Sequence, residues 1–138
     1  MSRDVQYLPP TEHARGGAVL EIYDVSDPRL PLPLATTSRS SLEDPASRGG
    51  APPANTLGCS AYGLDVHPSF GQAGGPAAVT FFEHGLRVLG VDASGQLTEA
   101  GGFIPAGGNS STPVWITDEI LYVIDLHRGI DVLRFGGS

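Results

Sequence analysis

Three short stretches of the chain share one pattern of apolar and charged positions. The stretches are Val19–Val25, Gly85–Val91 and Gly129–Phe135, and they align without gaps. Bulky apolar residues recur at matching positions with one charged residue among them, which is typical of β-strands. The aligned sets are Leu20, Leu86 and Ile130; Glu21, Arg87 and Asp131; Ile22, Val88 and Val132; Tyr23, Leu89 and Leu133; and Val25, Val91 and Phe135.

The middle stretch predicts a strand that is covered on both faces. Side chains alternate along a strand, so Leu86 and Val88 point to one face while Leu89 and Val91 point to the other. A strand with one face in water shows polar residues there, whereas a strand between two sheets is apolar on both faces. We therefore expect this strand to lie between packed sheets, as the inner strands of stacked propeller blades do.

The second and third stretches belong to a longer repeat. Each follows another β-rich run, Ala78–Phe82 or Ile120–Ile124, across a tight turn that carries His and Gly. Val88 and Val132 are 44 residues apart, close to the roughly 40–50 residues of one propeller blade. The first stretch lies 66 residues before the second, and an insertion at 38–55, rich in Ser, Pro, Gly and Arg, accounts for the excess.

The pattern therefore predicts an all-β fold of propeller-like antiparallel blades, with about one complete blade and two partial ones. We expect an irregular N-terminal segment at 1–17 and a repeat region at 18–138. Within the repeat region we expect a partial blade at 18–37, a loop or disordered insertion at 38–55, a full blade at 56–104 and a partial blade at 105–138. The expected strands lie near 18–25, 32–37, 62–67, 77–82, 85–92, 97–104, 112–116, 119–125 and 129–135.

These motifs resemble the LVIVD-repeat β-propellers, a bacterial and archaeal family. The resemblance rests on Phe82–Leu89, on Leu121–Leu133 and on the turn Ile22–Pro28, which reads Asp-Val-Ser-Asp-Pro at its end. It implies a propeller with no general reaction assigned to it and no catalytic set to carry over, often in extracellular or envelope proteins. A closed propeller needs four to eight blades, so the resemblance also implies a fragment of a larger propeller with its missing blades upstream.

Composition narrows the possible partners. The 138-residue chain has a net charge of −7, and all eight of its basic residues are Arg. An acidic surface without Lys does not neutralise phosphates, so we expect no nucleic-acid partner and no phosphate-binding P-loop. The N-terminus has no apolar signal-peptide core and no run of 18 apolar residues occurs, so we expect no membrane span. The localisation stays open.

Few residues are candidates for chemistry. His84 and His127, one in each His-Gly turn, are the candidate metal ligands; His67, Asp65, Glu83 and Asp125 complete the same hypothetical cluster. Zinc needs three or four converging ligands, and the alternative is that each His orders its own turn. Cys59 is the only cysteine and has no basic neighbour that activates a nucleophile, so we expect a structural thiol. No catalytic motif and no cofactor site is predicted.

Two functions from different classes remain open. The first is a non-enzymatic propeller-type scaffold or interaction module, whose partner is another protein or the missing blades of the same propeller. Open blade edges also favour self-association. The alternative is a metal-dependent propeller enzyme with His ligands in the turns between strands.

Overall fold

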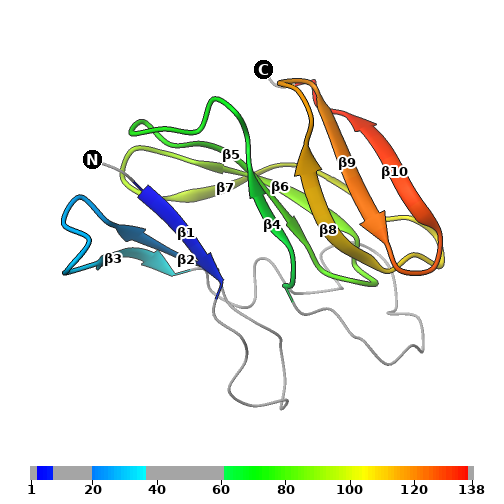
Figure 1. Ribbon diagram of the computed structural model, residues 1–138, viewed down its shortest axis with the longest axis horizontal. Coiled ribbons are helices and arrows are strands. Elements are labelled where there is room, and N and C mark those ends of the chain that lie inside the picture. The colour runs from blue at the N-terminus through cyan, green and yellow to red at the C-terminus, as the bar shows by residue number, and fades with distance from the viewer. Residues whose placement is uncertain (1–2, 8–19, 37–60, 137–138) are drawn as a thin grey trace, which may run out of the picture.

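The computed structural model describes residues 3–7, 20–36 and 61–136 (Figure 1). These residues form ten β-strands and no helix, which confirms the all-β expectation for the described part of the chain. The strands are β1 (Arg3–Tyr7), β2 (Leu20–Asp24), β3 (Leu32–Thr36), β4 (Leu64–Val66), β5 (Gly75–Thr80), β6 (Leu86–Val91), β7 (Leu97–Phe103), β8 (Ser110–Trp115), β9 (Ile120–Asp125) and β10 (Gly129–Arg134).

The ten strands form three antiparallel sheets. The first sheet has the order β1-β2-β3, the second β4-β5-β6-β7 and the third β8-β9-β10, so each strand pairs with its neighbour in the sequence. The three sheets follow one another across the molecule in chain order (Figure 1). Short antiparallel connections of this kind suit a chain that is rich in Gly and Pro.

The second sheet lies between the other two. Its register places Ala78 opposite Val88 on one face, and Ala77 opposite Leu89 on the other. Ala78 and Val88 pack against the third sheet, while Ala77 packs against Ile22 of the first. We call the face toward the third sheet the forward face and the face toward the first sheet the backward face. The expected burial of this strand on both faces is confirmed, because five of the six β6 residues are buried.

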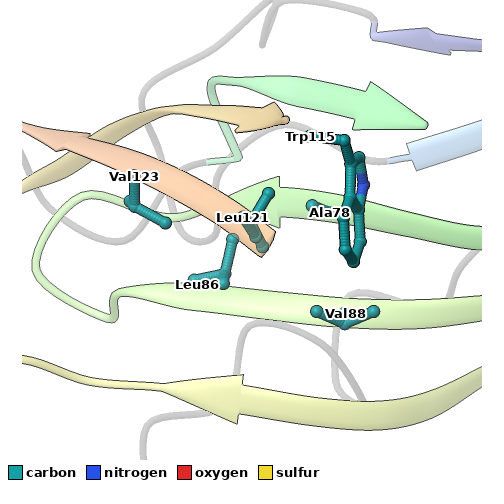
Figure 2. Close-up of a cluster of buried hydrophobic side chains, with 6 residues drawn as sticks. All are labelled: Ala78, Leu86, Val88, Trp115, Leu121 and Val123. Carbon is teal, nitrogen blue, oxygen red and sulfur yellow. The ribbon is translucent and has the colours of Figure 1, made fainter. Parts of the chain in front are cut away.

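The forward face of the second sheet and the third sheet share one hydrophobic core. Trp115, Leu121 and Val123 of the third sheet meet Leu86 and Val88 of β6 (Figure 2). Phe103, Leu133 and Phe135 are half-buried at its margin. Burying large aliphatic and aromatic side chains contributes roughly 1.5–3 kcal/mol each, so this core is the main attachment of the third sheet.

The backward face is covered by the first sheet. Ile22 of β2 is fully buried against Ala77 and Val91, and Leu34 of β3 packs on the same cluster. Leu34 also lies over the turn before β7, because a Cβ placed on Gly95 would come within 2.8 Å of it. The edge strand of the first sheet therefore lies over the β7 edge of the second.

Some details differ from the sequence-based expectations. β1 lies inside the segment that we expected to be irregular, and it gives the first sheet a third strand by pairing with β2. The strand expected at 77–82 ends at Thr80, because Phe82 adopts a φ of +48° and its backbone pairs with Ser110 instead. The insertion expected at 38–55 lies outside the described residues.

Candidate functional site

His67 joins the second sheet to the third. Its Nε2 lies 2.8 Å from the carbonyl oxygen of Asp118, and its Nδ1 lies 2.6 Å from Oγ of Ser69. The ring also meets Trp115 edge to face, with 4.7 Å between the ring centroids. Both nitrogens are engaged within the protein, so His67 has a structural role here.

The two candidate metal ligands occupy equivalent turns but different environments. His84 is buried in the turn between β5 and β6, next to the buried Glu83, whereas His127 is exposed in the turn between β9 and β10. Within residues 3–7, 20–36 and 61–136, no three His, Cys, Asp or Glu side chains come together in a way that could hold a metal ion. Cys59 lies outside the described residues.

Asp125 organises the turn that carries His127. Its carboxylate accepts hydrogen bonds from the backbone N–H groups of Asn109, His127 and Arg128, at 2.7–2.9 Å. Burial alone raises the pKa of this carboxyl, but the three N–H donors and the nearby Arg128 charge favour the ionised form more strongly and lower its pKa overall. The Asp125 carboxylate therefore stabilises the turn between β9 and β10.

β10 is an edge strand of the third sheet, and its edge offers backbone groups for binding. β10 pairs only with β9 among the described strands. The N–H of Phe135 bonds to the carbonyl of Glu119, and bonding alternates along an antiparallel pair. The backbone groups of Ile130, Val132 and Arg134 consequently point away from β9, toward the open edge.

A groove of about 350 Å³ runs beside this edge. One wall is the forward face of β6 and β7, and the other is the inward face of the third sheet. A Cβ placed on Gly101, in the β7 wall, meets no atom within 4 Å, so the described residues leave this space open. The groove, which we call the β10 groove, is lined by Leu86, Val88, Ala100, Gly101, Gly102, Phe103, Leu121, Leu133, Arg134, Phe135 and Gly136.

Two equivalent glycines show what is different about this edge. Gly85 precedes β6 and Gly129 begins β10, and both have positive φ, +71° and +103°. A Cβ on Gly85 would lie 2.1 Å from the carbonyl oxygen of Phe103, because β7 lies alongside. A Cβ on Gly129 meets nothing within 4 Å. No described strand takes, beside β10, the position that β7 fills beside β6.

The sequence predicted open blade edges in general but did not identify this one. The signal lay in the repeat, because a further strand follows the first and the second copy of the aligned strand, at Leu32–Thr36 and Leu97–Phe103. The β10 groove itself was not predicted, because one wall comes from β6 and β7 and the other from β9 and β10, which belong to different sheets. The described residues contain no helix that is long and apolar enough to span a membrane.

Comparison with protein-family models, curated proteins and solved structures finds no match to this chain.

Proposed function

We propose that this chain is a non-enzymatic, propeller-type interaction module that binds an extended segment of a partner protein along the open edge of β10. The three sheets correspond in this proposal to consecutive blades, the third of which takes its outermost strand from the partner. The observation that carries the proposal is the contrast between Gly85, crowded by β7, and Gly129, which is open.

The equivalent edge in each of the other sheets is occupied. β6 pairs with β7, and β2, which carries the first copy of the aligned strand, pairs with β3. The register gives the backbone groups of β6 and β10 the same orientation. Leu86 and Val88 direct their N–H and C=O groups toward β7, and Ile130 and Val132 direct theirs toward the open edge. An added strand would therefore meet, in a known register, backbone groups of β10 that pair with no described strand.

The groove indicates what kind of strand fits. Strand addition takes its affinity from main-chain hydrogen bonds and its specificity from pockets for alternate side chains. The pockets here are apolar, because Leu86, Phe103, Leu133 and Phe135 line them. The ligand we propose is an extended peptide with apolar residues at alternate positions, and no proline where the backbone N–H must donate.

The first experiment uses the chain's own β7 sequence as the probe. A synthetic peptide of residues 95–104 is titrated into the ¹⁵N-labelled chain, and the amide signals of Ile130, Val132 and Arg134 are followed. We expect saturable shifts at these three amides. The matched control peptide replaces its Gly101 with Pro, which removes an N–H donor from the middle of the strand. Equal shifts with both peptides, or none with either, would refute strand addition at β10.

A graft tests the same site within one chain. The residues Asp92–Phe103 are appended directly after Phe135, which is equivalent to Val91. Linking the strand covalently raises its effective concentration to the millimolar range, so we expect the graft to pair with β10 and to abolish peptide binding. The control graft carries Pro at its copy of Gly101 and should leave peptide binding unchanged. A functional graft that leaves peptide binding intact would count against the proposal.

A further inference from the structure

The side of the third sheet that faces away from the second sheet is apolar. We call it the outer face; it consists of Val114, Tyr122, Ile124, Ile130 and Val132, all of which are exposed. The register makes them neighbours, because Tyr122 lies opposite both Val114 and Val132, and Ile124 lies opposite Ile130. A sheet face in water is ordinarily polar, and a contiguous exposed apolar patch marks an interaction surface.

The repeat indicates what this surface contacts. Ile22, Val88 and Val132 occupy the same position in the three aligned strands. Ile22 is 0% exposed against the second sheet, Val88 is 4% exposed against the third, and Val132 is 62% exposed. Ile22 and Val88 are buried because each packs against the sheet that follows its own in the chain. Val132 points forward in the same way, so the outer face is suited to a further sheet of the same kind.

The opposite end of the stack offers a complementary face. Glu21 and Tyr23 lie on the side of β2 away from Ile22, and the Tyr23 hydroxyl donates to the Glu21 carboxylate at 2.6 Å. Tyr23 is equivalent to Leu89 and Leu133, both of which point backward. The charges are also compatible. Arg134 lies opposite Ile120 beside the outer face, with a largely exposed side chain whose Nε is 4.0 Å from the Glu119 carboxylate, and Glu21 would bring a second carboxylate to it.

We infer that the outer face binds the Glu21–Tyr23 side of the first sheet in a second copy of this chain, so that two copies close a ring of six sheets. The inference rests on the propeller-type arrangement of the proposed function. Closed propellers have four to eight blades. The described residues of one copy form three sheets, fewer than a closed propeller needs, and those of two copies form six. Two copies fit, and two-fold closure is the commonest symmetry of soluble oligomers.

Oligomeric state is the first test. Light scattering after size-exclusion chromatography should give twice the 14.3 kDa chain mass. Val132→Glu places a charge in the outer face and should raise the dimer dissociation constant at least about 30-fold, the effect of losing a hot-spot residue. Ile104→Glu changes an exposed isoleucine outside the third sheet and should leave the dimer intact. A monomeric wild type, or larger species that do not close at two copies, would overturn the inference.

Two further variants keep the test decisive. Val132→Thr keeps the β-branched shape, so a smaller rise in the dissociation constant is expected even if Val132→Glu does not fold. Cross-linking in a Cys59→Ser background tests which face of one copy contacts the outer face of the other. A short bismaleimide should join Tyr23→Cys chains to Val132→Cys chains when the two are mixed, and neither variant to itself. Linking of Val132→Cys chains to one another would show two outer faces in contact and would overturn the ring.

The dimer and the strand site can fail separately. Peptide binding at β10 is measured on a Val114→Glu variant, which changes the outer face on β8 and not the β10 edge, and which we expect to be a monomer. A monomer that binds the peptide would support the proposed function and refute the ring. A dimer that does not bind the peptide would support the ring and refute strand addition at β10.

Discussion

The carboxylate of Asp65, in β4, accepts a hydrogen bond of 2.7 Å from the backbone N–H of Trp115, at the end of β8. These two residues lie 50 positions apart in the sequence. The contact ties the first strand of the second sheet to the first strand of the third. Thr80 makes a second tie of this kind, since its hydroxyl donates to the carbonyl of Ser111 at 2.7 Å. The third sheet is therefore attached by directed hydrogen bonds as well as by its apolar core.

Replacing Asp65 should loosen the third sheet. Asp65→Ala leaves the Trp115 N–H without its charged acceptor, and loss of such a bond costs about 1.5–3 kcal/mol of unfolding free energy. Urea denaturation measures the loss, and Trp115 is the only tryptophan, so its fluorescence reports on this contact directly. Glu119→Gln, in an exposed and weakly paired position, is the control and should change stability by less than about 0.5 kcal/mol. Equal effects of the two variants would contradict this role for Asp65.

Asp125 should make stability depend on pH in the acid range. Its pKa in the folded state lies below the ordinary value of 3.8. A carboxyl with a lowered folded pKa stabilises the protein above its unfolded pKa, and this contribution is lost as pH falls through the folded pKa. Unfolding free energies of wild type and Asp125→Asn, measured between pH 7 and pH 2, should therefore converge below about pH 4. A constant difference across this range would show that Asp125 ionisation is not involved.

Gly85 and Gly129 should respond differently to the same substitution. Gly129→Ala adds only the cost of a left-handed backbone, about 1–2 kcal/mol. Gly85→Ala adds the same cost and also drives a methyl group into the carbonyl of Phe103, so we expect a substantially larger loss, measured by thermal and urea denaturation. In the chain that carries the grafted strand, Gly129→Ala should become as costly as Gly85→Ala. Unchanged tolerance at Gly129 in the graft would mean that the strand is not beside β10.

Metal content separates the two classes of function. The interaction module predicts less than about 0.2 equivalents of bound zinc or other divalent metal per purified chain, because a stable site needs three or four ligands. The alternative, a metal-dependent enzyme, predicts about one equivalent of bound metal per chain. His84→Ala and His127→Ala should then each lose that metal. Elemental analysis of the three proteins decides between these outcomes. His67→Ala is a useful comparison, since it should reduce stability without altering metal content.

Local pattern was sufficient for much of the fold. The alternation at Leu86, Val88, Leu89 and Val91 predicted a strand apolar on both faces, and the structure places that strand between two sheets. The tight turns that carry His and Gly were predicted as well, and the glycine in each of them has a positive φ. These features depend on side-chain direction and backbone sterics within a few residues, which sequence order determines directly.

Strand ends and unusual burial were harder to predict. β1 has no strong apolar alternation, and its strand depends on pairing with β2. Arg87 occupies a position that is charged in all three repeats, yet its side chain is buried with the guanidinium 5.1 Å from the centre of the Phe81 ring. A pattern of apolar and charged positions does not predict such a stabilising contact, because it treats every charged residue as exposed.

The sequence alone determined that the described chain is a succession of short antiparallel strands with a repeated, two-faced apolar core, because alternation and turn chemistry are local. Only the tertiary structure decided which positions of the repeat are covered. Gly85 and Gly129, or Val88 and Val132, are near-identical in sequence context, but one of each pair is packed and the other is open. That difference depends on whether another strand or sheet lies alongside, and it is what turns the edge of β10 and the outer face into candidate binding surfaces.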